Sequence, residues 1–277
     1  MGRVETRMYR RRQKRAAWIR WLLLLILGIA AVVLLWQGGQ ASFFAEHMGE
    51  TAPTPISAEF DKTVESREVT LPEENWYAIQ TGVFSTQEAA LQKADAYTSR
   101  GAPGTVVRQG EKWRVFIACY GTEEEASAVR TRLETSQKVD TYLYAWTCPE
   151  LRLRLTGMAG QLDAVEAGFT LLTTAAGTLR DTAMLLDAAQ LTTQEAASAV
   201  DELDGQISLW ADTIRSRFGK PYPALVADML AITDGWDARY AALGKAGDAT
   251  ALSAALKAQA MGLFDEICTW RAILEAQ

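Results

Sequence analysis

The feature that most constrains this chain is a long apolar run that follows directly on a cluster of basic residues. Residues 18–36 are apolar except for Arg20, and a tryptophan stands at each edge. As a helix the run would extend ~28 Å, close to the ~30 Å thickness of the hydrocarbon core of a bilayer. Tryptophan favours the membrane interface, and an arginine near a helix end can extend toward the headgroups. We therefore expect a transmembrane helix over residues 18–36.

The distribution of charge predicts how this helix is oriented. Residues 1–20 carry eight Lys or Arg and one Glu, whereas the rest of the chain carries 20 basic and 33 acidic residues. Basic residues concentrate on the cytoplasmic side of membrane proteins. The pattern predicts a cytoplasmic tail over 1–17 and an extracytoplasmic C-terminal part in the cell membrane. A cleaved signal peptide is the alternative, although the run exceeds the usual length of a signal-peptide core.

Residues 37–74 change in character. Glycine, proline, serine and acidic residues are mixed there without a sustained period, which predicts a flexible extracytoplasmic linker. The single histidine of the chain, His47, falls in this segment, so no histidine remains for the folded part. We expect neither a catalytic site nor a metal or other cofactor.

The cysteines Cys119, Cys148 and Cys268 show no spacing typical of a zinc site. The strands that end near Cys119 and Cys148 should be separated by one other strand, which puts their Cα atoms ~9 to 10 Å apart. A disulfide requires less than ~7 Å between the Cα atoms. An internal disulfide is therefore not expected.

Between residues 75 and 147 the hydrophobic period alternates between that of strands and that of helices. One helix is expected after Ser85, and a second begins at the capping box Thr122-Glu123-Glu124-Glu125. The expected strands are Trp76–Phe84, Thr105–Arg108, Lys112–Tyr120 and Thr141–Trp146. The order βαββαβ predicts a ferredoxin-like α+β domain, with a four-stranded antiparallel sheet, both helices on one face and the other face open.

The open face of this sheet is the candidate site. If Ile79 and Ile117 face the helices, alternation along the strands places a mixed polar and aromatic set on the other side. The candidate binding residues are Trp76, Gln80, Arg114, Phe116, Tyr142, Tyr144 and Trp146. The last three depend on the parity of the final strand, and the opposite parity stays open. Amide and guanidinium donors can bond sugar hydroxyls while flat rings cover apolar sugar faces. An ordinary solvated sheet face is the alternative.

RNA-recognition domains share this topology and stack bases on sheet aromatics. The part beyond the apolar run is acidic, however, and lacks the Arg/Lys-Gly-Phe-Gly-Phe type of segment that such domains carry. Nucleic acid is therefore not an expected partner.

Three segments resemble the SPOR (sporulation-related repeat) domain of bacterial envelope proteins. They are Ile79-Gln80-Thr81-Gly82-Val83-Phe84-Ser85 followed by Glu88-Ala89-Ala90, then Trp113-Arg114-Val115-Phe116-Ile117, and Thr122-Glu123-Glu124-Glu125-Ala126. The resemblance covers residues 75–147. It implies binding to septal peptidoglycan whose glycan strands have lost their stem peptides, in cell division or sporulation. The expected protein is then a non-catalytic binder enriched at the septum.

From residue 150 to 277 the period is helical. Apolar residues from Leu151 to Leu186 alternate in spacings of four and three, a coiled-coil type of seam that predicts one long helix. The expected helices cover residues 151–186, 193–218, 225–243 and 249–274. Four amphipathic helices on short links predict an antiparallel bundle. A three-helix bundle with the first helix extended as a stalk also fits.

The function expected of this bundle is protein binding. Its acidic residues fall mostly between seam positions, where a solvated face is the default. The first helix is longer than the others, so part of its seam should lack an internal partner and invite self-association or a partner helix. We also expect the bundle to fold on its own. The alternative function is a cell-wall hydrolase whose bundle supplies two carboxylates.

Overall fold

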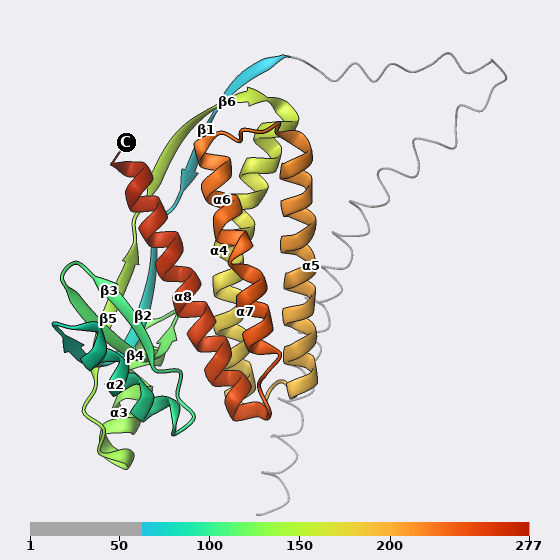
Figure 1. The fold of residues 1–277 in the computed structure, drawn as a ribbon. Coiled ribbons are helices and arrows are strands. Elements are labelled where there is room, and N and C mark those ends of the chain that lie inside the picture. The colour runs from blue at the N-terminus through green and yellow to red at the C-terminus, as the bar shows by residue number, and fades with distance from the viewer. Residues whose placement is uncertain (1–62, 277) are drawn as a thin grey trace, which may run out of the picture. The chain divides into compact units, whose positions relative to one another are not determined.

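A computed structural model describes residues 63–276, which belong to one compact unit (Figure 1). The predicted tail 1–17, the predicted transmembrane helix 18–36 and the first part of the predicted linker lie outside the described residues. Within residues 63–276, no helix combines the length and the apolar character needed to cross a membrane.

The sheet domain has the predicted βαββαβ order. Its elements are β2 (Glu74–Phe84), α2 (Gln87–Thr98), β3 (Thr105–Gln109), β4 (Lys112–Tyr120), α3 (Glu123–Arg132) with a π-helical turn η1 (Leu133–Gln137), and β5 (Tyr142–Cys148). The strands form a four-stranded antiparallel sheet in the order β3-β4-β2-β5. The α+β prediction with a four-stranded antiparallel sheet is confirmed. The strand β2 also separates β4 from β5, as expected from the topology.

Both helices of this domain begin where a threonine caps them. The hydroxyl of Thr86 accepts a hydrogen bond from the backbone of Ala89, and that of Thr122 accepts one from Glu125. Each cap satisfies one of the backbone donors that a helix start leaves free. Ile79 of β2 packs in one cluster with Ala126 of α3. Ala90 and Ala94 of α2 pack on Val115 of β4, which points to the same side as Ile79, so both helices cover the same face of the sheet.

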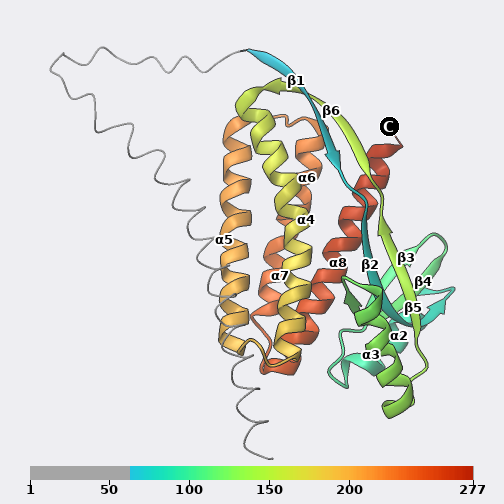
Figure 2. The ribbon, with the colours of Figure 1, turned by 180° about the vertical axis from the view of Figure 1, so that it is seen from behind.

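A two-stranded antiparallel ribbon, β1 (Val64–Leu71) and β6 (Leu151–Met158), joins the sheet domain to the helices (Figures 1 and 2). The predicted linker is therefore wrong for residues 64–71, which form a strand. The prediction that a helix begins at Leu151 is also wrong. Leucines at 151, 153 and 155 alternate with arginines, and this period of two is satisfied by a strand with one face on the core.

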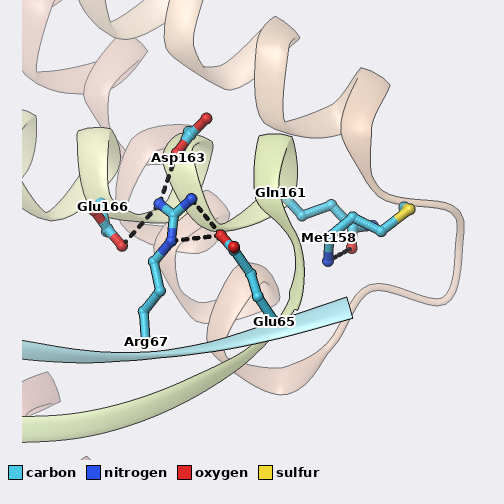
Figure 3. Close-up of polar contacts among 6 residues, drawn as sticks. All are labelled: Glu65, Arg67, Met158, Gln161, Asp163 and Glu166. Carbon is cyan, nitrogen blue, oxygen red and sulfur yellow. Dashed lines mark hydrogen bonds and ion pairs between the residues drawn. The ribbon is translucent and has the colours of Figure 1, made fainter. Parts of the chain in front are cut away.

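Arg67 ties the ribbon to the first helix of the bundle (Figure 3). Its guanidinium donates to Glu65 on its own strand at 2.7 Å, and to Asp163 and Glu166 on the helix at 2.6 and 3.3 Å. These carboxylates raise the pKa of Arg67 further above its ordinary value. An arginine among three carboxylates remains charged, so the ribbon stays paired with the helix beneath it.

The bundle contains α4 (Ala159–Asp187), α5 (Thr193–Arg217), α6 (Ala224–Asp234), α7 (Trp236–Leu243) and α8 (Ala249–Glu275). The predicted third helix is divided at Gly235 into α6 and α7. The apolar seam of α4 is buried from Leu162 to Leu186. A first helix extended as a stalk is therefore wrong, and so is the expectation of an uncovered seam. The shorter α4 finds its partners, α5 and α8, within the same chain.

The sheet domain and the bundle share one hydrophobic core. Figures 1 and 2 both place α8 between the sheet domain and the other helices. Trp76, Phe116 and Trp146 of the sheet belong to the same buried cluster as Phe169 of α4 and Phe264 of α8. The expectation of an independently folding bundle is thus at odds with the structure, because removing either part would expose this core to water.

A buried arginine lies where the ribbon bends into the sheet. Arg271 of α8 is 1% exposed, and its guanidinium donates to the backbone oxygens of Pro72 at 2.9 Å and Pro149 at 3.5 Å. It also donates to the hydroxyl of Thr173 on α4 at 3.1 Å. Pro72 follows β1 and Pro149 follows β5, so the side chain of Arg271 binds both segments that connect the ribbon to the sheet.

Candidate functional site

The candidate binding residues lie on one face of the sheet, opposite α2 and α3. Strand pairing places Trp76 opposite Trp146, and Gln80 opposite both Tyr142 and Phe116. Residues directly opposite each other in an antiparallel pair point to the same side. The predicted parity of the last strand, with its aromatics on this face, is therefore what the structure shows. We call these residues the aromatic face; its members are Trp76, Gln80, Arg114, Phe116, Tyr142, Tyr144 and Trp146.

The prediction that this face is open is wrong for its apolar part. Trp76 is fully buried and stacks on Phe264 of α8 with ring centroids 4.1 Å apart, while the guanidinium of Arg180 on α4 lies 4.6 Å from the same ring. Trp146 meets Phe264 edge-on at 5.4 Å. Phe116 is fully buried as well. The hydrophobic effect explains this arrangement, because large rings on an apolar sheet face are more stable under α8 than in water.

The polar part of the aromatic face remains accessible. Arg114 donates a hydrogen bond to the side-chain oxygen of Gln80 at 2.7 Å and lies 4.7 Å from the centre of the Tyr144 ring. Tyr142, beside them, is 64% exposed. Gln80 itself is buried, so it acts by orienting Arg114. The structure therefore brings together an exposed ring, a half-buried ring and a held guanidinium.

An open groove of about 740 Å³ borders this polar part. It lies where the tip of the β3–β4 hairpin, the second half of β5 and the C-terminal half of α8 meet, and its lining includes Arg108, Tyr144, Trp146, Asp265 and Thr269. Its size suits a small ligand or a short segment of a polymer. Its walls carry rings, hydroxyls and charged groups, which are kinds of group that can contact a sugar.

Asp265 is the acidic residue of this groove. Burial raises the pKa of its carboxyl to about 6, and the neighbouring Glu266 contributes in the same direction. A carboxyl of this kind is protonated in mildly acidic solution and charged in neutral solution. Its protonated form can donate a hydrogen bond to an oxygen of a bound ligand, which its ionised form cannot.

The raised pKa predicts how stability depends on pH. Because the folded pKa of Asp265 lies above the unfolded value, the native state holds the proton more tightly, so stability falls as the pH rises from about 4 to about 6. Asp265→Asn should flatten this decline and, after discounting for solvent screening, raise the free energy of unfolding at pH 7 by ~1 kcal/mol. Urea unfolding at several pH values measures both effects, and an unchanged pH profile in the variant would contradict them.

Sequence reasoning missed Asp265 and Arg108 as groove residues. Asp265 is one acidic residue of an amphipathic helix, where acids are normally solvated, and Arg108 lies near the end of a hairpin strand. No local sequence pattern marks these two residues, because they line a common groove only when α8 packs against the sheet.

A four-stranded sheet with two helices on one face and a cluster of rings, amide and guanidinium on the other defines a small α+β domain with a candidate binding face. The family model of the SPOR domain matches residues 62–145. The chain therefore carries a SPOR domain, and the resemblance seen in its sequence is confirmed.

Two curated relatives match part of the chain. They are the endolytic peptidoglycan transglycosylase RlpA of Salmonella typhi and that of Salmonella typhimurium, each 29% identical over 68 residues. The match covers 24% of this chain and 18% of each relative. No solved structure matches the chain.

Proposed function

We propose that this chain is a membrane-anchored, non-catalytic protein that binds peptidoglycan, acting at the septum in cell division or sporulation. The observation that carries the proposal is the SPOR domain at residues 62–145, since such domains bind peptidoglycan in cell division proteins. The ligand we propose is the glycan strand without stem peptides. The anchor is the apolar run 18–36, with the N-terminus in the cytoplasm and the C-terminus outside the cell membrane.

The accessible polar part of the aromatic face is the proposed contact with glycan. Tyr142 offers an exposed ring for the apolar face of a sugar, and Arg114 offers donors for hydroxyl and N-acetyl oxygens. Arg114 is held by Gln80 and Tyr144 before any ligand arrives, so little side-chain freedom is lost on binding. Trp76, Phe116 and Trp146 support this part from beneath α8 and reach ligand only if α8 moves.

Binding to cell walls tests the proposal. The full chain in detergent micelles should bind purified sacculi, and bind sacculi stripped by an amidase more tightly than untreated ones. Tyr142→Ala should weaken this binding about tenfold, because a ring stacked on a sugar contributes ~1 to 1.5 kcal/mol. Arg114→Lys, which keeps the charge and loses the planar fork, should weaken it to a similar degree.

The control for this experiment is Leu209→Ala on α5, since Leu209 is 70% exposed and lies on the bundle. It should bind as the unaltered chain does. Equal affinity for stripped and untreated sacculi would remove the claim about stem peptides, and unaltered binding by Tyr142→Ala would remove the proposed contact.

A cell-wall hydrolase is the second candidate. The name of the two relatives and the raised pKa of Asp265 favour it, since glycosidases use a carboxylic acid to protonate the leaving oxygen. Such enzymes generally need a second carboxylate ~5 to 10 Å away, and Asp265 is the one acid among the described residues that line the groove. Incubation with purified walls separates the two functions, because a hydrolase releases soluble fragments and a binder leaves the walls intact.

The sequence predicts a protein partner for the bundle. An uncovered seam on the first helix was its premise, and that seam is buried. Self-association or a protein partner stays a prediction. What the structure does assign to the bundle is the covering of the aromatic face by α8.

A further inference from the structure

Two thiols lie against each other where the sheet meets α8. Cys148 ends β5 and is fully buried, while Cys268 lies on α8 in the wall of the groove and is 8% exposed. Both belong to the same buried cluster, and each thiol shifts the pKa of the other, lowering that of Cys148 and raising that of Cys268. Less than one turn further along α8, Arg271 contacts the backbone of Pro149, the residue after Cys148. This second contact fixes which part of α8 faces the end of β5.

The third cysteine serves as an internal comparison. Cys119 lies near the end of β4, on the other side of β2 from Cys148. Burial raises the pKa of its thiol to about 12. Its charged neighbours are Arg180 and Asp181 on α4 and Lys257 on α8. Cys119 is thus as buried as Cys148 and belongs to a different part of the core.

We propose that Cys148 and Cys268 form a disulfide that fastens α8 across the aromatic face, so that the redox state of this pair decides whether the face can be uncovered. The two thiols belong to one buried cluster on either side of the boundary between β5 and α8, so a bond between them would join these two elements directly. The disulfide itself follows from this placement. Its effect on ligand access rests on the proposed function.

The oxidant is a disulfide of a small-molecule or protein thiol. The thiolate of Cys268, which the groove reaches first, attacks one sulfur of that oxidant and releases one thiol, forming a mixed disulfide. The thiolate of Cys148 then attacks the sulfur of Cys268 and releases the second thiol. Two electrons and two protons leave the cysteines and appear in the two thiols of the reduced oxidant. The neighbouring thiol of Cys148, and then burial, raise the pKa of Cys268, so exchange should be slow while α8 is in place.

Mapping the bond tests the first half of the inference. The full chain in detergent micelles is incubated with oxidised glutathione, unfolded in the presence of a maleimide and digested for mass spectrometry. We expect a linked peptide pair containing Cys148 and Cys268, with Cys119 labelled by the maleimide. The oxidised chain should melt ~5 to 10 °C higher than the reduced one. C119S should keep both results and C268S should lose both. Labelling of all three cysteines after oxidation, or a bond to Cys119, would overturn the proposal.

Binding to stripped sacculi tests the second half. The oxidised chain should bind at least about fivefold more weakly than C268S under the same conditions. Equal binding by the two would overturn the control of access. If the bond forms and neither protein binds, the proposed function fails while the disulfide stands.

Discussion

Arg271→Ala should lower the free energy of unfolding by ~3 kcal/mol or more, and the melting temperature by ~6 to 12 °C. The guanidinium is 1% exposed and donates to Pro72, Pro149 and Thr173. Its removal leaves two backbone oxygens at the bend without a buried donor and a cavity between α4 and α8. Urea unfolding followed by fluorescence measures the loss.

Two further substitutions serve as controls for this result. Arg152→Ala removes an arginine of the ribbon whose side chain is 78% exposed, and should change the free energy of unfolding by less than ~0.5 kcal/mol. Arg271→Met fills the space without donating hydrogen bonds. If Arg271→Met were as stable as the unaltered chain, the hydrogen bonds at the bend would not be the source of the stability.

Trp76→Ala should be about equally damaging, with a loss of ~3 to 5 kcal/mol. Trp76 is fully buried between Phe264 and Arg180, so its removal leaves a cavity between the sheet and the bundle. Phe264→Ala should cost a similar amount. The double variant should lose ~1 kcal/mol less than the sum of the single losses, because either single substitution already removes the stacking contact between the two rings.

The number of transitions in the unfolding curve is as informative as its midpoint. If the sheet domain and the bundle share one core, Trp76→Ala should shift a single cooperative transition seen both by fluorescence and by helical circular dichroism. Tyr142→Ala, which removes an exposed ring from the same face, should leave that transition in place. Two separate transitions, of which Trp76→Ala moves only one, would mean that the two parts fold independently.

The sheet domain was predictable because its signals are local. Each helix cap is formed by residues that lie within four positions of each other, as Thr122 and Glu125 do. The alternation of Ile79 and Gln80 indicates which side chain faces the helices. The capping box formed by Thr192 and Glu195 at the start of α5 is a local signal of the same kind. Such features need no knowledge of the rest of the chain.

The ribbon escaped prediction because two periods compete in one segment. Leu151 and Leu155 fit a helical seam, and Leu153 between them fits only a strand. The strand β1 was also hard to predict because of its charged side chains. Glu65 and Arg67 point toward α4 at positions where a strand that packs on a core normally has apolar residues. Asp163, the partner of Arg67 on α4, is distant in sequence, and a local pattern carries no sign of it.

The covering of the aromatic face could not be predicted for a related reason. The rings of Trp76, Phe116 and Trp146 are equally compatible with a sugar and with another protein surface, because both contacts bury flat apolar area. The deciding partner, Phe264, looked like an ordinary seam residue of the last helix. Only the packing of α8 against the sheet distinguishes the two.

The ribbon also determines how the molecule would carry a mechanical load. Tension applied to the chain ahead of Val64 and resisted by a wall-bound sheet passes along β1, directly through Pro72, into β2. A strand is already close to full extension at ~3.3 Å per residue, so it transmits force with little stretch. The helices branch off from β6 and lie beside this line of force rather than within it. If the chain is anchored and wall-bound as proposed, such a pull would therefore load the strands before it loads the helices.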